Sequence, residues 1–525
     1  MKIKSLIKTS MLLFMAGLFA ACANEDTIQE KEQKKPEPRV VATFGGGWAA
    51  PVKATASAKT RTTGTHIKGG PIKVEWTATD RIWAKGTDGT WYRSEPAQFA
   101  SADHSQANFS FTSGNFGMNP EVRYVGNSSD PNRVTVPQAQ SQTTLGVFSH
   151  LSASGDCGTA IAKGGGGDYE FTLKHKAAYI CFYPRIQNET LHHNVRLIAI
   201  SLLDYMYTNS ITGTFDFTDG IIKNKTAIAN SSISVTLDPN SAPIPSASRN
   251  DTCFYIAIRP SFASFGVSFS IKDPTTNVTT TITHTNWWTG SFEEGKVYDY
   301  TAWLDKDIKD YKYYMWDAKY DYWYGHWKAD GTPDGNYATN NSDPRWYNEG
   351  SGAITATQSC KDCPNVNELC WYIMKGDPHW DTQNILFSQN GHLRMGAHGI
   401  WLKKKTAILR DNSDITENRF SNAYPDDNGT DRDWRTVMGV SFPTINAVPI
   451  LGTPSNPADY FFLPALRYFN NGGQPGIGSF GYYWSSSGVP SNSNHAYYMG
   501  FNSSAVDFSY QTFYRSLGCL AQPFE

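Results

Sequence analysis

The chain has few charged residues, and the two signs are nearly balanced. Of its 525 residues, 46 are Lys or Arg and 48 are Asp or Glu, so the formal net charge is −2. No Lys/Arg-rich patch is interleaved with aromatic residues, which argues against nucleic acid as a partner. Residues 164–304 also lack a convincing 3.6-residue periodicity, so amphipathic helices are not expected there.

Motifs for catalysis and for cofactors are missing as well. Four histidines are scattered with no nucleophile motif beside them: His379, His392, His398 and His495. Cys360-Lys-Asp-Cys363 has zinc spacing, but no second pair or histidines follow at ligand spacing. Gly164–Gly167 precedes no P-loop lysine and is interpreted as a flexible interdomain hinge. We therefore predict no enzyme, no metal and no cofactor.

What the chain does contain is typical of an extracellular all-β protein. Aromatic residues make up 14% of the sequence, and Gly, Ser, Thr and Asn are abundant. Cys22 is assigned below to lipid, which leaves seven of the eight cysteines. Seven is odd, so at least one thiol stays free. In an oxidising envelope, disulfides are expected among the others.

The N-terminus is interpreted as a processing signal. Residues 1–21 hold three lysines and then an apolar run, Met11–Ala21, which is shorter than the roughly 20 residues of a membrane-spanning helix. Removal of this segment changes the net charge to about −5. The stretch Leu18-Phe19-Ala20-Ala21-Cys22 resembles a bacterial lipobox, which implies lipid on Cys22 and attachment to the outer membrane. The alternative is an ordinary cleaved signal with an incidental cysteine.

Residues 22–38 are predicted to form a disordered tether. The run is charged, contains proline and has no apolar periodicity, so it buries too little surface to fold. Its first acidic residues, Glu25 and Asp26, resemble the signal that exports lipoproteins of Bacteroidota to the cell surface. A merely solvated tail is the alternative.

Length predicts about three domains. Short apolar runs recur about every ten residues up to residue 304, which is typical of β-sandwiches. We expect one sandwich over 39–163, a second over 164–304, and a further domain over 305–525. The expected strands are Val40–Phe44, Lys73–Trp76, Asp80–Ala84, Asn108–Phe111, Arg133–Pro137, Tyr169–Leu173, Ala177–Phe182, Asn194–Leu202, Ile211–Phe217, Ile233–Leu237, Phe254–Ile258, Gly266–Ile271 and Lys296–Trp303.

Marks within residues 40–304 together resemble the fimbrillin family. They are, in the family's order, Val74–Ile82, Leu173–Ala178, Val195–Ile200 followed by Ile211–Gly213, and Glu294–Tyr298. The resemblance implies a mainly β chain with two tandem fimbrillin-like β-sandwiches. It also implies a surface lipoprotein whose partners are other fimbrillin-type pilin subunits.

Fimbrillin-type pilins lose their first strand by cleavage after an arginine, and a neighbour's strand fills the groove. Arg61 is the processing candidate, because it follows the strand Val40–Phe44 in a small polar loop suited to proteolysis. Arg39 is a second candidate. The alternative for Arg61 is an ordinary exposed loop arginine. Cleavage would release the chain from its lipid anchor.

The C-terminal third opens with an aromatic segment, Tyr311–Trp327. Its nine aromatic residues are Tyr311, Tyr313, Tyr314, Trp316, Tyr320, Tyr322, Trp323, Tyr324 and Trp327. They could form an exposed platform for sugars or a packed core at a domain junction. The core interpretation is favoured, because so large an exposed aromatic patch is rarely tolerated.

Residues 315–525 resemble the major paralogous domain of Fibrobacter, which is C-type-lectin-like. The marks are Phe462–Ala465, Gly481–Ser487, Asn494–Phe501 and Ser516–Leu520, after an expected helix at 363–372. The resemblance implies an α+β domain in which Cys519 bonds with Cys370 or Cys363. Phe462 and Ala465 depart from the commoner Arg-Leu-Pro-Thr form.

Calcium is not expected in this domain, because it needs six to eight oxygen ligands. The loop Gln474-Pro475-Gly476 has no acid after it. The acidic cluster Asp426-Asp427-Asn428 with Asp431 and Asp433 fits a solvated turn better.

Three functions remain open from sequence. The first is a pilus tip adhesin, because a whole domain occupies the end from which a shaft subunit would donate a strand. The second is a stand-alone surface lipoprotein that binds glycans. The third is a structural assembly or anchor protein without a ligand. The ligand of an adhesin would be a host or bacterial surface protein or a glycan.

Overall fold

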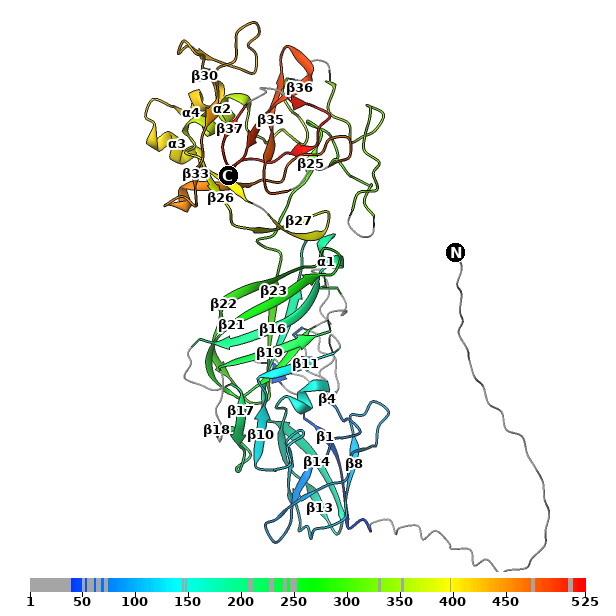
Figure 1. Ribbon diagram of the computed structural model, residues 1–525. Helices are drawn as coiled ribbons and strands as arrows, with labels where there is room; N and C mark the ends of the chain where they lie inside the picture. Colours follow the sequence, from blue (N-terminus) through cyan, green and yellow to red (C-terminus); the bar gives the residue numbers. More distant parts are fainter. Residues whose placement is uncertain are drawn as a thin grey trace, which may run out of the picture. The chain divides into compact units, whose positions relative to one another are not determined.

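The computed structural model describes most of the chain from residue 39 onward (Figure 1). The described residues are 39–49, 52–53, 61–62, 68–69, 74–143, 146, 149–205, 211–225, 231–238, 243–245, 253–328, 332–350, 354–396, 398–473, 477–508 and 513–525. The predictions for a signal peptide (1–21), lipid on Cys22 and a tether (22–38) lie outside this range. No helix within it is long and apolar enough to cross a membrane.

The first β-domain is built on a nine-stranded sheet. Its order is β6-β5-β9-β12-β14-β1-β8-β7, with β13 beside β14. The strands are β1 (Ala42–Trp48), β5 (Trp83–Lys85), β6 (Trp91–Arg93), β7 (Gln98–Phe99), β8 (Ala107–Phe111), β9 (Glu121–Tyr124), β12 (Gly158–Ile161), β13 (Lys163–Gly165) and β14 (Asp168–His175). A separate parallel pair joins β3 (Arg61–Thr62) to β4 (Val74–Glu75). Buried and exposed residues alternate along β8 and β14, so each strand buries one face.

The glycine run at 164–167 is a hairpin turn, not the interdomain hinge predicted from sequence. It connects β13 to β14, which pair antiparallel. Gly164, Gly166 and Gly167 have φ values of 130°, 69° and 106°, in the region that glycine enters without a Cβ clash. Because β14 then pairs with β1, the first β-domain continues past residue 163 to His175. Glycines that make a tight turn and glycines that make a linker are alike in sequence.

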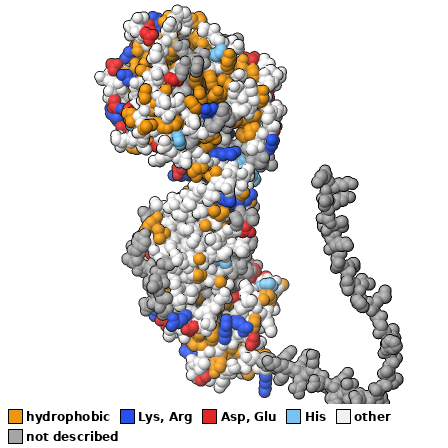
Figure 2. All heavy atoms as spheres, viewed as in Figure 1, with side chains coloured by type: hydrophobic (Ala, Val, Ile, Leu, Met, Phe, Trp, Pro, Cys, Tyr) orange, Lys and Arg blue, Asp and Glu red, His pale blue; other side chains and the backbone are white. Residues whose placement is uncertain are grey.

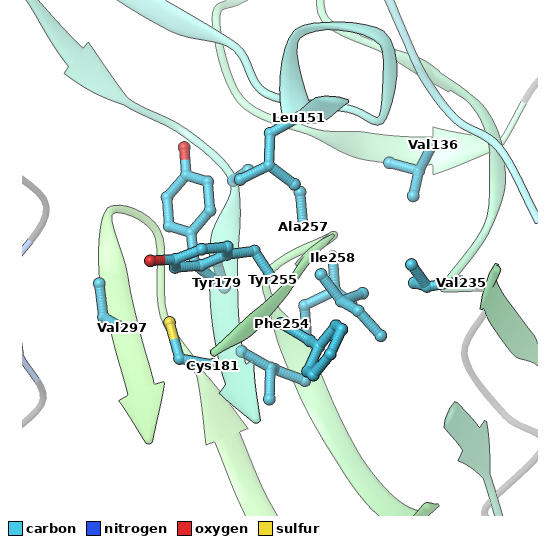
Figure 3. Packing of buried hydrophobic residues seen from close by; sticks show 14 of the residues in the cluster. Val136, Leu151, Tyr179, Cys181, Val235, Phe254, Tyr255, Ala257, Ile258 and Val297 are labelled. Atoms are coloured by element: carbon cyan, nitrogen blue, oxygen red, sulfur yellow. The ribbon is translucent and has the colours of Figure 1, made fainter. Parts of the chain in front are cut away.

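The second β-domain is a sandwich of a five-stranded and a four-stranded sheet. Their orders are β11-β19-β16-β21-β22 and β2-β23-β15-β20, and a small sheet β10-β17-β18 adjoins them. The strands are β2 (Val52–Lys53), β10 (Arg133–Val136), β11 (Ala139–Gln142), β15 (Ala178–Arg185), β16 (Arg196–Asp204), β17 (Gly213–Asp216), β18 (Lys223–Lys225), β19 (Ser232–Leu237), β20 (Phe254–Ile258), β21 (Ser261–Asp273), β22 (Val278–Phe292) and β23 (Lys296–Trp303). In Figure 3, buried side chains of β15, β20 and β23 lie with Leu151, which belongs to the 3-10 helix η1 (Ser149–Ala153).

The two β-domains share strands, which corrects the predicted tandem division. β10 and β11 fall within the predicted first sandwich, yet they pair with β17 and β19 of the second domain. β2 likewise pairs with β23. The chain therefore enters the second domain twice before β15. One continuous cluster of buried hydrophobic residues spans both domains, so they are expected to support each other's stability.

The second sandwich presents a mostly polar face in Figure 2. Hydroxyl groups of β21 and β22 form hydrogen bonds across this face, between Ser264 and Thr289 (2.8 Å), Ser268 and Thr283 (2.9 Å), and Ser270 and Thr281 (3.1 Å). Such cross-strand pairs stabilise an antiparallel sheet that faces water on one side. These neutral hydroxyl pairs explain how a solvent-exposed sheet surface can have so few charged side chains.

Residues 305–525 form an α+β domain. Its sheets are β25-β39-β35-β36-β37-β32 with β38 beside β36, β33-β26-β29-β34, β24-β27-β28 and β30-β31. The strands are β24 (Lys309–Asp310), β25 (Tyr313–Tyr314), β26 (His379–Asp381), β27 (Ile385–Gln389), β28 (His392–Gly396), β29 (Gly399–Lys403), β30 (Tyr424–Pro425), β31 (Asp431–Arg432), β32 (Asn446–Ala447), β33 (Ile450–Leu451), β34 (Tyr460–Pro464), β35 (Gly481–Val489), β36 (Asn492–Phe501), β37 (Val506–Asp507), β38 (Phe513–Tyr514) and β39 (Cys519–Leu520). Among the described residues, none of these strands extends the sheets of the β-domains.

Among its described residues this domain has three α-helices, α2 (Val366–Lys375), α3 (Lys405–Asp411) and α4 (Glu417–Asn422), and a 3-10 helix, η3 (Pro457–Asp459). The helix expected at 363–372 corresponds to α2. The N-cap residue of α2 is Asn365, whose side chain accepts hydrogen bonds from the backbone N–H groups of Asn367 and Glu368. The Glu368 carboxylate accepts from the backbone N–H of Asn365 in return, which completes a capping box. With its long β-sheets and short helices, the chain is mainly β, as predicted.

The hairpin β27–β28 joins this domain to the second sandwich. His392 Nδ1 lies 2.9 Å from Asp273 Oδ2 at the end of β21, and both side chains are buried. Burial acts to raise the pKa of Asp273, but the hydrogen bond and charge of His392 hold it below the usual 3.8. Leu393 belongs to the buried cluster of the β-domains. The short helix α1 (Leu191–Asn194) also contacts the hairpin, because Asn194 Nδ2 donates to the Gly391 carbonyl.

Candidate functional site

β1 occupies an internal position in the first sheet although it is the first strand in the sequence. It pairs in parallel with β14, from Thr43 opposite Asp168 to Trp48 opposite Leu173. On its other side it pairs antiparallel with β8. Removal of β1 would therefore leave two strands with unpaired backbone groups and a gap between them.

Phe44 is the first of two aromatic side chains through which β1 enters the core. Its ring stacks on Tyr169 at 4.4 Å between centroids and an interplanar angle of 15°. Edge contacts to Phe111 at 5.0 Å and Phe116 at 5.3 Å complete the surrounding wall. Phe44 has no exposed surface, so the side chain contributes on the order of 2–3 kcal/mol of burial free energy.

Trp48 is the second aromatic side chain, four residues further along. Its ring stacks on His175 at 4.2 Å, makes an edge contact with Tyr124 at 5.1 Å and lies tilted against Trp76 at 5.6 Å. Beneath it, His175 Nδ1 lies 2.7 Å from the Tyr179 hydroxyl. This histidine is buried, which fits packing and not a catalytic role.

Between these two aromatics, β1 consists of glycine. A Cβ on Gly46 would lie 2.3 Å from the Phe171 carbonyl oxygen, and one on Gly47 would lie 2.5 Å from the Ser105 carbonyl oxygen. Trp76 Nε1 donates to the Gly46 carbonyl at 3.0 Å. The site therefore admits only a strand with large apolar groups at two positions four apart and no side chain midway between them. Three glycines also make β1 an intrinsically weak strand.

The outer side of β1 borders a large open hollow of about 1550 Å³. Gly45 contributes backbone to its lining, and Lys174 of β14 and Arg123 of β9 lie along it. The Arg123 guanidinium lies over the Trp91 ring at 4.3 Å. β1 therefore borders the hollow at Gly45 and Gly46, while Phe44 and Trp48 are buried in the core.

The two processing candidates have different positions relative to β1. Arg39 is exposed and precedes the strand. Arg61 follows it and begins β3, a two-residue strand, where the sequence predicted a loop. Cleavage after Arg39 would leave β1 in place, whereas cleavage after Arg61 would separate both β1 and β2 from the rest of the chain. Cys22 lies outside the described residues.

The predicted disulfides are absent from the structure. All seven described cysteines are free and buried, including the candidates Cys363, Cys370 and Cys519. Cys370 lies in α2 and Cys519 in β39. Two effects raise the pKa of the Cys363 thiol well above its usual 9.0. The larger is the hydrogen bond with Cys360, and the second is burial. Pairing of Cys519 with Cys370 or Cys363 was implied by resemblance alone, and the structure does not form it.

The aromatic segment Tyr311–Trp327 is mostly core, in line with the favoured interpretation. Its buried aromatics are Tyr311, Tyr313, Trp316, Tyr322 and Trp323. Tyr324 differs, because 52% of its surface is exposed. A cavity of about 260 Å³ lies here, lined by this segment together with Thr190 and the tip of the β27–β28 hairpin.

The acidic cluster at 426–433 forms a hairpin turn. The Asp426 carboxylate accepts hydrogen bonds from the backbone of Asn428 and Thr430 and pairs with Arg432 at 2.6 Å. Asp433 pairs with Arg435 at 2.7 Å. Among the described residues no group of three His, Cys, Asp or Glu side chains could hold a metal ion. The loop 474–476 lies outside the described residues.

Sequence reasoning missed the hairpin that completes the cavity. Gln389-Asn390-Gly391-His392 carries the Asn-Gly pair that favours two-residue turns with positive φ. Asn390 and Gly391 do have φ values of 53° and 73°. That pair could have predicted β27 and β28. Their contact with the second sandwich has no comparable local signal.

Comparisons with known proteins yielded structural neighbours only. No family model matches the sequence, and no curated protein matches it. A candidate cell adhesion protein from Bacteroides ovatus is similar over 50% of this chain and 92% of its own, with 16% identity and a TM-score of 0.31. One from Bacteroides uniformis covers 51% and 95%, with 14% identity and a TM-score of 0.29. A fimbrial anchor protein from Porphyromonas gingivalis covers 46% and 81%, with 9% identity and a TM-score of 0.19. Likeness at this level carries no conclusion about the function of this chain.

Proposed function

We propose that this chain is a surface lipoprotein that becomes the tip-type adhesin subunit of a pilus. Cleavage after Arg61 removes β1, and a strand from a neighbouring pilin subunit fills the groove between β14 and β8. The C-terminal α+β domain, which we take to be C-type-lectin-like, then presents the ligand-binding surface. Before cleavage, lipid on Cys22 holds the chain at the outer membrane.

One observation carries this proposal: the first strand is internal, and the chain holds it through few side chains. β14 keeps β12 and β13 as partners when β1 leaves, and β8 keeps β7. The vacated groove offers two rows of backbone hydrogen-bonding groups and the two aromatic pockets of Phe44 and Trp48. A donor strand that pairs with these edges gains main-chain hydrogen bonds, and the pockets select its side chains.

The shape of the groove defines the donor. The strand must run parallel to β14, as β1 does. It must carry large apolar side chains at positions i and i+4 and glycine at i+2 and i+3, because the Phe171 and Ser105 carbonyl oxygens leave no room for a Cβ at Gly46 and Gly47. A pilin tail with this pattern is the partner that the groove fits.

The C-terminal residues support a distal position. β39 pairs with β25 and β35 inside the C-terminal domain. Phe524 is buried, and the Glu525 carboxylate accepts a hydrogen bond from the Tyr372 hydroxyl at 2.9 Å. Residues 519–525 are therefore not free to act as a donor strand. A subunit that accepts a strand but does not donate these residues suits the tip.

N-terminal sequencing of the protein from sheared surface filaments tests the proposal. We expect the mature chain to begin at Thr62. Arg61→Ala should keep β1 in place and exclude the protein from filaments, whereas the matched change Arg39→Ala should leave incorporation unchanged.

A mature N-terminus at Cys22 in all surface material would refute the pilus role. It would favour a stand-alone glycan-binding lipoprotein, the second candidate, whose support is the aromatic cavity in the C-terminal domain. Labelling of this protein along pilus shafts would refute the tip position alone.

A further inference from the structure

The cavity at the aromatic segment combines ring faces with hydrogen-bonding groups. Its volume is about 260 Å³, near the lower end for small-molecule sites. The side chains that matter for recognition are Asp310, Lys312, Asp321, Trp323, Tyr324 and Trp327. They come from one stretch of chain, so their spacing is fixed by β24, β25 and the turns that follow.

Tyr324 supplies an aromatic face that water can reach. Its ring stacks on Tyr320 at 4.2 Å with an interplanar angle of 19°, so a second ring supports it. Trp327, partly buried, lines the same cavity. A preorganised ring with an open face suits the apolar face of a pyranose, because binding then orders little additional protein.

Asp321 Oδ1 already accepts a hydrogen bond from the backbone N–H of Trp323 at 3.2 Å, which leaves the second carboxylate oxygen for a ligand. Among the described residues, no ion pair joins Lys312 to Asp310 or Asp321. Trp323 is 1% exposed, and its indole N–H has no hydrogen-bond partner in that part of the chain. Because this indole N–H is closed off from solvent, a ligand in the cavity does not reach it.

The charges restrict the class of ligand. Two carboxylates disfavour an anion, and the ammonium of Lys312 disfavours a cation such as choline in the aromatic cavity. A neutral ligand with several hydroxyl groups can use carboxylate acceptors, the Lys312 donor and the ring of Tyr324 together. A sugar residue has this combination of an apolar face and a hydroxyl-bearing edge.

We infer that this cavity binds a neutral sugar residue of a glycan, stacked on Tyr324 with its hydroxyl groups on Asp321 and Lys312. An adjoining hollow of about 460 Å³, which shares Thr190, Asp310 and Lys312 with it, has room for the next residue of the glycan. The inference names the ligand class of the domain that the proposed adhesin presents, and it rests on that proposal only for its biological setting.

The test uses the full mature chain and a panel of neutral oligosaccharides ending in glucose, galactose, mannose, fucose or N-acetylglucosamine. Binding is followed by tryptophan fluorescence and by titration calorimetry. We expect at least one probe to bind. Tyr324→Ala should weaken it about 10-fold, and Asp321→Asn about 10- to 100-fold.

Tyr514→Ala is the matched control, because Tyr514 is a 60% exposed tyrosine of the same domain that does not line this cavity. It should leave the affinity unchanged. The inference is overturned if no probe binds at up to about 10 mM, if choline binds in place of sugars, or if the control weakens binding as much as Tyr324→Ala. Incorporation into filaments is scored separately in the same variants. Normal incorporation without sugar binding defeats this inference and leaves the donor-strand proposal standing.

Discussion

The first β-domain and the C-terminal domain hold their terminal strands in opposite ways. β1 is internal, but it is rich in glycine, borders an open hollow and is followed by a candidate cleavage site. β39 is also internal, yet it pairs with β25 from the start of its own domain, and the residues after it are packed. Exchange of a strand therefore depends less on its position in the sheet than on whether its neighbours remain supported without it.

The largest expected effect comes from removing β1. A chain that lacks residues 1–61 should lose hydrogen-exchange protection at the amides of β14 and β8 that bond to β1, while the amides that bond to β12, β13 and β7 keep theirs. The amides of β35 and β36 should stay protected. Adding a peptide of residues 39–50 should restore the first set. Full protection of β14 and β8 without the peptide would break the comparison.

Trp48→Ala should have the next largest effect. Loss of a buried tryptophan costs about 3–5 kcal/mol, and here it also removes the stack on His175. Urea unfolding should show the change in the transition of the β-domains alone. Trp434→Ala, equally buried in the C-terminal domain, should shift only the other transition. Trp303→Ala, 40% exposed, serves as the surface control.

Lowering the pH should destabilise the second sandwich and the C-terminal domain over different pH ranges. Burial lowers the pKa of His150 in the second sandwich from 6.5 to about 4. Between pH 6.5 and 4, His150 is protonated in the unfolded chain but not in the folded chain. The free energy of unfolding therefore falls as the pH drops through this range, by about 3 kcal/mol at most. His150→Gln should remove this slope from unfolding curves measured across that range.

The C-terminal domain should lose stability at lower pH. Burial acts to raise the pKa of Asp381, but hydrogen bonds from Gln383, Trp401 and Thr453 lower it below 3.8. This stabilisation is complete above 3.8 and is lost as pH falls through the lowered value. A C-terminal transition that weakens already at pH 6 would contradict the assignment.

The smallest effect concerns the glycines of β1. Gly46→Ala should destabilise the first β-domain by about 1–3 kcal/mol, because its Cβ meets the Phe171 carbonyl. Gly45→Ala is the matched control, since its Cβ would lie 3.0 Å from the flexible end of the Asn108 side chain and 3.9 Å from the Tyr169 carbonyl oxygen, an ordinary contact distance. Thermal unfolding should separate the two variants. Equal melting temperatures would mean that the groove is wider than β1 requires.

Local sequence patterns predicted many elements but not their partners. Phe254–Ile258 and Lys296–Trp303 were predicted with the bounds that β20 and β23 have, because apolar residues dominate or alternate along them. The pattern of β10 is just as clear, yet nothing in it indicates pairing with β17 some 80 residues later. Domain membership therefore could not be predicted where strands cross between domains.

The candidate sites were predictable to different extents. The aromatic segment was visible in sequence, and its interpretation as core holds for most of its rings. That Tyr324 remains exposed depends on the fold around Asp321, whose backbone carbonyl accepts from the Tyr324 N–H. The groove under β1 could be expected from the fimbrillin resemblance, but its demand for glycine comes from Phe171, which lies more than 120 residues away.

The hairpin β27–β28 gives the C-terminal domain a second attachment to the rest of the molecule. The covalent connection runs through Leu304 and the residues that follow. The second attachment is non-covalent and consists of the buried Leu393 side chain and the His392–Asp273 pair. In the proposed adhesin, tension on a bound ligand would be shared between the covalent connection and the buried His392–Asp273 pair. Two attachments should restrict rotation of the C-terminal domain under force more than a single covalent connection would.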